Sequence, residues 1–257
     1  MDLHLNGKSV LVTGGTRGIG LACARAFAGE GAHVTIAGST QASADKAQRL
    51  LRGEGIEVQA VCADLSRAHE RQALAERLRG LDILVNNAGA IPGGGLTALS
   101  DEQWRSAWDL KVHGYIDTTR LALPEMMARG AGVIVNVIGI AAEMPRYDYL
   151  CGAAGNAALS TFTRAVGAHA TTRGVRVLGV NPGPTETDRL VKLYKARALQ
   201  KFGDESRWEE MLGHLPFGRA ARPEEIADLV IYLASDRASY LSGVVIDADG
   251  GAQYMSA

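Results

Sequence analysis

Short apolar runs alternate with longer amphipathic segments along most of this 257-residue chain. The runs have the length and β-branched content of buried strands, whereas the segments between them carry alanine, leucine and charged residues at helical spacing. The predicted strands are residues 9–12, 32–37, 56–61, 81–86, 132–137, 175–180 and 244–247. The predicted helices are residues 41–52, 66–79, 100–127 and 150–173, with Ser66 and Ser100 at two of their starts, and a further helix begins at Pro223.

Strands that alternate with helices of this length predict a parallel sheet, because a parallel neighbour is reached only through a crossover. We therefore expect an α/β fold, namely a single-domain doubly wound (Rossmann-type) sheet of about seven parallel strands with helices on both faces. With 47% hydrophobic residues, the chain is long enough to bury one sizeable core. Residues 1–257 are accordingly predicted to form one domain.

The helical and strand patterns weaken between residues 182 and 216. Helical fragments here carry Tyr194, Phe202, Trp208 and Met211 among charged residues. The stretch follows the carboxyl end of a strand, where open α/β sheets bind ligands, so one interpretation is a substrate lid at residues 184–216. The alternative is a surface helical hairpin without a special role.

Charge and cysteine content argue against several function classes. The 27 lysine and arginine residues are balanced by 28 aspartate and glutamate residues, so nucleic acid is not an expected partner. No stretch approaches the roughly 18 apolar residues of a membrane span, and the first residues lack a signal-peptide core, so we expect a cytoplasmic protein with no membrane partner. Cys23, Cys62 and Cys151 lack metal-ligand spacing and lie in apolar surroundings, which favours buried reduced thiols over a metal site.

A glycine-dense turn at residues 13–20 joins the first predicted strand to an amphipathic segment. Strand, tight turn and helix in this order point the unpaired N–H groups of the helix at the turn, which makes a site for phosphate. Gly14 and Gly18 would let the backbone approach a pyrophosphate, and Gly20 would let the helix pack close to the strand. The alternative is a flexible loop that binds nothing.

Five motifs in order give the chain a resemblance to the classical short-chain dehydrogenase/reductase family. They are Thr13-Gly14-xxx-Gly18-x-Gly20, Asp64-Leu65, Asn86-Asn87-Ala88-Gly89, Asn181-Pro182-Gly183-Pro184-Thr185 and Asp249-Gly250-Gly251. The resemblance covers essentially the whole chain and implies a dinucleotide cofactor. The predicted cofactor-binding residues are Gly14, Thr16, Arg17, Gly18, Ile19, Gly20, Ser39, Asp64, Leu65, Asn87, Ala88, Gly89, Asn156, Pro182, Gly183 and Thr185.

The residues after the second predicted strand favour NADP(H) over NAD(H). Selection for NAD(H) normally uses a carboxylate here, which bonds the ribose hydroxyls and repels a 2′-phosphate, and residues 37–40 contain no acid. Arg17 could meet a 2′-phosphate, with hydrogen bonds from Ser39 and Thr40. The alternative is that Arg17 is a solvated side chain.

All four catalytic positions that the resemblance implies carry other residues. The family uses a tyrosine as general acid/base, a lysine four residues later that lowers its pKa and bonds the nicotinamide ribose, a serine at the substrate oxygen, and an asparagine on a proton path. Alignment on Gly155-Asn156-Ala157-Ala158-Leu159 puts Gly152 at the tyrosine and Asn156 at the lysine. Gly139 stands at the serine and Lys111 at the asparagine.

Other side chains could take over the proton chemistry. Tyr147 and Tyr149 precede Gly152, whose missing side chain frees volume for a phenol. Our hypothesis is that Lys111 poises Tyr149, or less favourably Tyr147, while Asn156 keeps a neutral hydrogen bond to the ribose. The alternative is that both tyrosines only line a pocket and Lys111 forms an ordinary surface ion pair.

Three functions are therefore compatible with the sequence. The first is an NADP(H)-dependent oxidoreductase acting on a small carbonyl or alcohol with rearranged acid/base groups. The others are a non-redox enzyme on the same scaffold, and a catalytically silent NADP(H)-binding subunit or sensor. In relatives the two long helices pair between subunits, so the resemblance also implies a homodimer or homotetramer.

Overall fold

The computed structural model, which describes residues 2–255, contains a seven-stranded sheet in the order β3-β2-β1-β4-β5-β6-β7, with every neighbouring pair parallel. The strands are β1 (Ser9–Thr13), β2 (His33–Gly38), β3 (Gln59–Cys62), β4 (Ile83–Asn86), β5 (Gly132–Val137), β6 (Val175–Pro182) and β7 (Val245–Ala248). The strand order reverses between β1 and β4, so a crevice for ligands is expected where their carboxyl ends diverge. This confirms the predicted single-domain α/β sheet.

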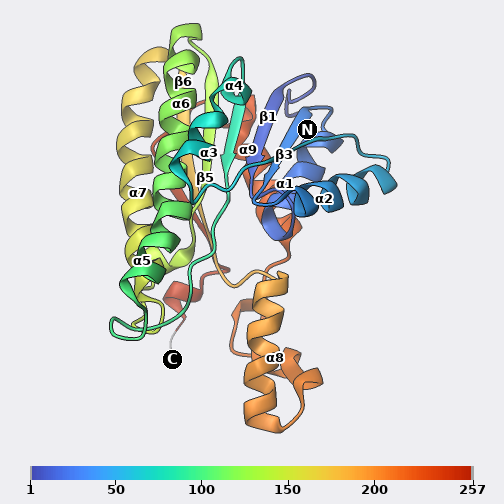
Figure 1. Cartoon of the computed structure of the whole chain (residues 1–257), viewed down its shortest axis with the longest axis vertical. Helices are drawn as coiled ribbons and strands as arrows, with labels where there is room; N and C mark the ends of the chain where they lie inside the picture. Colours follow the sequence, from blue (N-terminus) through green and yellow to red (C-terminus); the bar gives the residue numbers. More distant parts are fainter. Residues whose placement is uncertain (1, 256–257) are drawn as a thin grey trace.

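Helices cover both faces of the sheet (Figure 1). The α-helices are α1 (Gly18–Gly29), α2 (Gln41–Gly53), α3 (Ala68–Ala73), α4 (Ala75–Leu78), α5 (Asp101–Trp108), α6 (Gly114–Arg129), α7 (Leu150–Ala170), α8 (Asp188–Phe202) and α9 (Pro223–Ala234). The short helical turns are η1 (Asp109–His113, a π-helix), η2 (Ile140–Ala142), η3 (Thr171–Arg173), η4 (Glu205–Leu212), η5 (Pro216–Gly218), η6 (Asp236–Ala238) and η7 (Ala252–Tyr254). Among residues 2–255, no helix has the length and apolar character needed to span a membrane.

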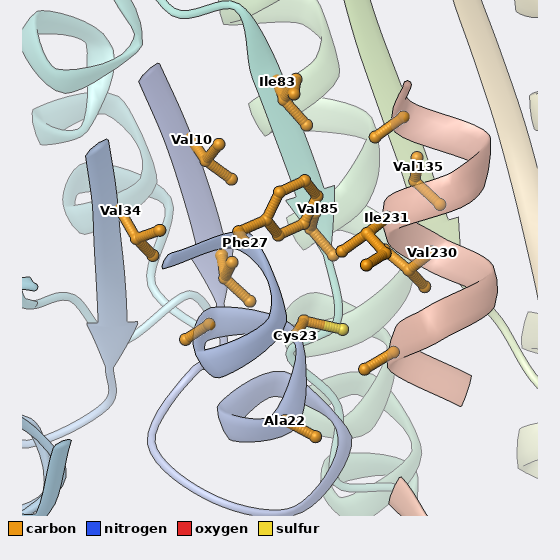
Figure 2. Close-up of a cluster of buried hydrophobic side chains, with 14 of the residues drawn as sticks. Val10, Ala22, Cys23, Phe27, Val34, Ile83, Val85, Val135, Val230 and Ile231 are labelled. Carbon is orange, nitrogen blue, oxygen red and sulfur yellow. The ribbon is translucent and has the colours of Figure 1, made fainter. Parts of the chain in front are cut away.

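The core lies in two main layers because successive strand residues point to opposite faces. On β1, Val10 and Val12 pack with α1 and α9, whereas Leu11 packs on the other face with residues of α4 and α6. Figure 2 shows the first layer, where the Phe27 ring of α1 lies among side chains of the central strands and of α9. Each face of the sheet is therefore sealed by its own helices, as a doubly wound fold requires.

Two predicted elements begin or end differently in the structure. Ser66 does not cap a helix, because its hydroxyl donates to the Asp64 carboxylate at 2.7 Å and α3 begins two residues later. The predicted helix 66–79 is divided at Leu74 into α3 and α4. Cys62 is exposed rather than buried, because it ends β3, the outermost strand of the sheet.

The predicted helix 100–127 is correct at its start and interrupted in its middle. Ser100 accepts a hydrogen bond from the Gln103 N–H at 3.2 Å, and the Gln103 side chain accepts from the Ser100 N–H, so the capping interaction is reciprocal. The π-helix η1 then separates α5 from α6. Such an extra residue in a helical turn commonly marks a functional position, and Lys111 lies in it.

The segment after β6 forms a small body of its own. In Figure 1, α8 projects from the rest of the chain, and η4 packs beside it. Their contact is a separate apolar cluster in which Tyr194, Leu212, Leu215 and Ala220 are buried. The segment is therefore folded independently of the sheet layers, although it remains attached at the carboxyl edge.

We expect Phe27→Ala to lower the free energy of unfolding by about 3–5 kcal/mol, because a fully buried ring is removed from a packed layer. Denaturant unfolding followed by circular dichroism measures the change. Tyr240→Ala is the control, since Tyr240 is fully exposed and its loss is expected to change stability by less than about 0.5 kcal/mol. Equal effects of the two substitutions would contradict the assigned packing.

Candidate functional site

The glycine turn is held tightly against the carboxyl ends of β1 and β4. A Cβ at Gly20 would lie 2.3 Å from the Gly14 carbonyl oxygen, so only glycine fits where α1 starts. Gly14 and Gly18 have φ values of +62° and +53°, which other residues rarely adopt. The Asn87 amide donates to the carbonyls of Thr13 and Gly14 at 3.2 and 3.1 Å. The turn and the loop after β4 therefore form one cradle.

The backbone N–H groups at the start of α1 receive no side-chain cap. Arg17 stands at the N-cap with extended backbone, its side chain is exposed, and it makes no capping hydrogen bond. The first N–H groups of α1 are thus directed into the cradle without a side-chain acceptor, an arrangement suited to a pyrophosphate. Ile19 is half-buried against the core beneath the turn.

The turn also meets the end of β2, where the cofactor preference was predicted. A Cβ at Gly38 would lie 2.7 Å from the Thr16 methyl, so these two backbone segments are close neighbours. Ser39 is exposed at this edge. The Thr40 hydroxyl accepts the Ser43 N–H at 3.2 Å and so caps α2. Because a hydroxyl that accepts can still donate, Arg17, Ser39 and the Thr40 O–H all remain available at this edge.

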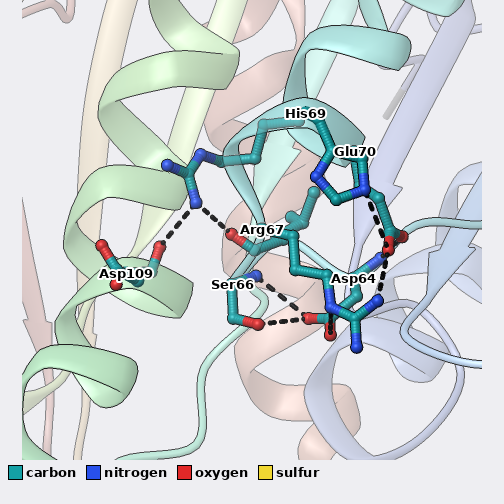
Figure 3. Close-up of polar contacts among 8 residues, drawn as sticks. Asp64, Ser66, Arg67, His69, Glu70 and Asp109 are labelled. Carbon is teal, nitrogen blue, oxygen red and sulfur yellow. Dashed lines mark hydrogen bonds and ion pairs between the residues drawn. The ribbon is translucent and has the colours of Figure 1, made fainter. Parts of the chain in front are cut away.

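A polar cluster holds the loop after β3 (Figure 3). The Asp64 carboxylate accepts from the N–H and hydroxyl of Ser66 at 3.0 and 2.7 Å, and the Asp64 N–H donates to Glu70. Arg71, which is buried, donates to the Leu65 carbonyl and pairs with Asp117 of α6 at 2.7 Å. The roles of Glu70 and Arg71 were missed from sequence, since neither belongs to a recognised motif.

The segment after β6 returns to the glycine turn. A Cβ at Gly183, next to Pro182, would lie 2.9 Å from the Cα of Asp249, which keeps this loop close to the end of β7. The Thr185 hydroxyl, which is buried, donates to the Gly183 carbonyl at 3.0 Å. Thr187 brings the segment after β6 against the glycine turn, because its methyl would lie 3.0 Å from a Cβ on Gly18.

A fully buried polar network fixes the strands beneath the site. The Asn86 amide donates to the Asn136 oxygen at 2.9 Å, and Asn136 donates to Thr163 of α7 at 2.8 Å. Thr118 of α6 donates to Asn86 at 2.7 Å. Because buried polar groups are costly when unpaired, this network specifies how α6 and α7 sit on β4 and β5.

Lys111 points inward from η1 and is buried. Its ammonium donates to the Ile138 carbonyl at 2.5 Å, and a Cβ at Gly89 would lie 3.1 Å from its stem. Desolvation by burial and, to a smaller extent, the positive charge of Arg189 together lower the pKa of Lys111 from 10.5 to about 7. Lys111 therefore does not form the surface ion pair of the alternative interpretation.

Asn156 bonds the carbonyl of Gly139, the residue after Ile138, whose own carbonyl accepts from Lys111. Its Nδ2 donates to the Gly139 carbonyl at 3.2 Å, and a Cβ on Gly139 would lie 2.9 Å from that nitrogen. Gly139 also has a φ of +130°. The Oδ1 of Asn156 is buried and, among residues 2–255, has no hydrogen-bond donor. An acceptor in this position is open to a ligand hydroxyl.

The Tyr149 ring occupies the space above Gly152. A Cβ at Gly152 would lie 2.1 Å from the ring, so the Tyr149 ring in this position leaves room only for glycine at residue 152. The ring is half-buried in a cluster with Ile91, Trp108 and Cys151. The structure thus places this phenol where the missing side chain left volume.

Tyr147 lies in a different environment. It is 67% exposed, and its ring rests against Gly95. Neither phenol has a hydrogen bond with Lys111 in the described part of the chain, where the ammonium bonds Ile138. Tyr149 is accordingly the better placed of the two predicted phenols.

Sequence reasoning missed Arg189 altogether. It comes from the first turn of α8 and donates to the Ile91 carbonyl at 2.5 Å, across 98 residues of sequence. Its guanidinium carbon lies 5.8 Å from the centroid of the Tyr149 ring. No local sequence signal marks this residue, because only the path of the chain after β6 brings it to the site.

A metal centre has no support in the described residues. Within 2–255, no group of three or more histidine, cysteine, aspartate or glutamate side chains is arranged to hold a metal ion. Cys151 is fully buried and burial raises the pKa of its thiol, which opposes a nucleophilic role.

Comparison with known proteins finds relatives that match nearly the whole chain. The family model described as enoyl-(acyl carrier protein) reductase matches residues 14–253. D-beta-hydroxybutyrate dehydrogenase of Cupriavidus necator is 34% identical, over 96% of this chain and 98% of that protein. L-sorbose reductase of Gluconobacter frateurii, solved with NADPH and L-sorbose, superposes with a TM-score of 0.92 at 32% identity over 100% of both chains. A short chain dehydrogenase/reductase family protein superposes with a TM-score of 0.85 at 37% identity, over 99% of this chain and 100% of the other.

We expect the pH dependence of stability to reveal the buried ammonium of Lys111. Its folded pKa of about 7 lies below the unfolded value of 10.5, so between these values the unfolded chain binds more protons and stability rises with pH. Relative to Lys111→Met, the wild-type free energy of unfolding should increase by about 2 kcal/mol from pH 7 to pH 9. Urea unfolding of both proteins at each pH measures this difference, and a constant difference would show that Lys111 stays protonated when folded.

Proposed function

The chain belongs to the classical short-chain dehydrogenase/reductase family, and we propose that it is an NADP(H)-dependent oxidoreductase acting on a small carbonyl or alcohol substrate with rearranged acid/base groups. The observation that carries the proposal is the pairing of an intact dinucleotide cradle with two proton-carrying side chains, Lys111 and Tyr149, from the elements around it. When bound, the cofactor supplies or accepts the hydride.

The residues present fit a dinucleotide. Gly14, Gly20 and Gly183 lie where a Cβ would collide with neighbouring backbone, which keeps the cradle open to a pyrophosphate. The unpaired Asn156 oxygen would accept a ribose hydroxyl. In the same proposal Asp64 contacts the adenine amino group, the Asn87-Ala88-Gly89 backbone lines the cofactor, and Pro182 with Thr185 meets the nicotinamide.

The preference for NADP(H) rests on charge. Arg17 and Ser39 are both exposed, and their sequence neighbours Thr16 and Gly38 lie against each other. No acid occurs at residues 37–40 to repel a 2′-phosphate. L-sorbose reductase, a close structural neighbour, was solved with NADPH. Arg17 would pair with the 2′-phosphate, and Ser39 would donate a hydrogen bond to it.

The acid/base chemistry is assigned to Tyr149 with Lys111. In reduction, the Tyr149 phenol would give its proton to the substrate oxygen as the carbonyl carbon gains hydride, and in oxidation it would take the proton back. In this proposal the Lys111 ammonium would stabilise the developing phenolate through its opposite charge. With a pKa of about 7, Lys111 exchanges protons readily at neutral pH and so restores the phenol. Tyr147 is the less favoured donor because it faces solvent.

Two further features belong to this proposal. We propose that residues 184–216 act as the substrate lid, since Arg189 already connects α8 to Ile91 beside the site. We also propose a homodimer or homotetramer formed through α6 and α7, because α7 presents the small exposed residues Ala157, Ala158 and Thr161, which allow close helix contact. A cytoplasmic location remains a prediction from sequence.

A catalytically silent NADP(H)-binding protein is the second candidate function. Gly139 and Gly152 remove the hydroxyl and the phenol at the usual positions, and the Asn156 amide nitrogen is already bonded to Gly139. Such a protein would bind NADPH without oxidising it in the presence of any carbonyl compound. A non-redox enzyme would instead form product with no net change in the cofactor.

We expect Arg17→Ala to weaken NADPH binding by roughly tenfold and to leave NADH binding within about twofold, because only the 2′-phosphate loses its charged partner. Fluorescence titration of each cofactor measures both dissociation constants. Arg49→Ala is the matched control, since Arg49 is an exposed arginine of α2, which packs on the same face of the sheet as α1. If NADH binds wild type as tightly as NADPH, the proposed preference is wrong.

We expect Lys111→Met and Tyr149→Phe each to lower kcat/KM for carbonyl reduction by about 10²–10⁴-fold, the usual contribution of a positioned proton donor. NADPH oxidation with a panel of small aldehydes, ketones and oxo acids provides the assay. Tyr240→Phe, at a fully exposed position, controls for loss of a phenol elsewhere. Turnover that survives in a Lys111→Met, Tyr147→Phe, Tyr149→Phe triple variant would disprove the rearranged chemistry.

A further inference from the structure

Arg189 carries a positive charge to the edge of the proposed active site. One of its terminal nitrogens donates to the Ile91 carbonyl, and the guanidinium lies 5.8 Å from the centroid of the Tyr149 ring. Its charge also acts on Lys111. Ile91, Tyr149 and Lys111 therefore all interact with the same guanidinium.

Neither cation has an acidic partner. Among the described residues, no aspartate or glutamate forms an ion pair with Arg189 or Lys111. Other arginines of the same region are paired, as Arg207 is with Glu210 at 2.6 Å and Arg219 with Glu225 at 2.7 Å. Glu186 and Asp188, which shortly precede Arg189 in sequence, are exposed, and neither forms an ion pair with it in the described part of the chain.

Arg189 is exposed whereas Lys111 is buried, and the positive charge of Arg189 opposes the charge of Lys111. An anion bound next to both groups would relieve that repulsion. The guanidinium of Arg189 spends one N–H on Ile91, and among residues 2–255 no other acceptor engages it. Its remaining N–H groups form a planar fork, which matches the two oxygens of a carboxylate. The structure therefore has the donor set for an acid group next to the proposed proton donor.

We propose that Arg189 binds the carboxylate of the substrate, so that the substrate class is an oxo acid or the corresponding hydroxy acid. This inference rests on the proposed oxidoreductase function and adds to it the class of substrate. Arg189 is then the specificity-determining residue, and it comes from the proposed lid. Closure of α8 over the site would bring its guanidinium to the acid group.

The test compares each oxo acid with its primary amide, which has the same shape without the charge. For wild type, kcat/KM should favour the acid by roughly 10- to 100-fold, the range of a charge-assisted bidentate pair. Arg189→Met should bring the ratio close to one, and Arg189→Lys should retain part of it. Lys192→Met removes an equal charge from an exposed position on α8 and should keep the wild-type ratio.

A second measurement separates this inference from the redox proposal. Butanoate and butanamide contain no reducible ketone, so their binding in the presence of NADP⁺ is measured without reaction. Trp104 and Trp108 pack in the cluster with Tyr149, which makes tryptophan fluorescence a local reporter. We expect butanoate to bind more tightly than butanamide, and Arg189→Met to abolish the difference.

The outcomes are distinct. Selective butanoate binding that is lost in Arg189→Met, with no carbonyl reduced, would retain the carboxylate site and refute the oxidoreductase. Equal binding of butanoate and butanamide by wild type would overturn the carboxylate site. Weaker NADPH binding by Arg189→Met with unchanged acid selectivity would also overturn it, because the guanidinium would then contact the cofactor.

Discussion

The close approach of α1 to β1 and β4 is the constraint on which the site depends. A side chain at Gly20 would collide with the Gly14 carbonyl, and Asn87 ties that same carbonyl to the loop after β4. The contact sets the start of α1 at the place where the strand order reverses, and the Thr187 methyl is brought against Gly18 from the other side. The shape of the glycine turn and the approach of the chain after β6 to it both depend on this junction.

The second constraint is electrostatic. Lys111 is buried against the Ile138 carbonyl and forms no ion pair with the acids of residues 2–255, and burial of such an ammonium opposes its charge. A folded protein keeps such an arrangement at a cost in stability, which is common where a proton must move. The Asn86–Asn136 network beneath it is fully paired, so the rigid part of the scaffold and the strained part are adjacent but separate.

Two glycines near the site leave space that side chains from neighbouring positions occupy. Glycine at 152 leaves room that the Tyr149 ring fills, and glycine at 139 leaves room for the Asn156 amide. In each case the side chain of another residue lies where a Cβ on the glycine would project.

The sequence by itself determined the doubly wound parallel sheet and the glycine turn after its first strand, because strand periodicity and glycine spacing are local properties of the backbone. It misjudged Ser66, whose hydroxyl bonds the nearby Asp64 instead of capping a helix, and Cys62, which ends the edge strand β3. It also missed the division of helix 66–79 at Leu74. The tertiary structure alone decided that Tyr149 is half-buried while Tyr147 is exposed, that Lys111 is buried, and that Arg189 reaches Ile91. These depend on segments far apart in the chain meeting at one edge of the sheet, and no local pattern encodes such a meeting.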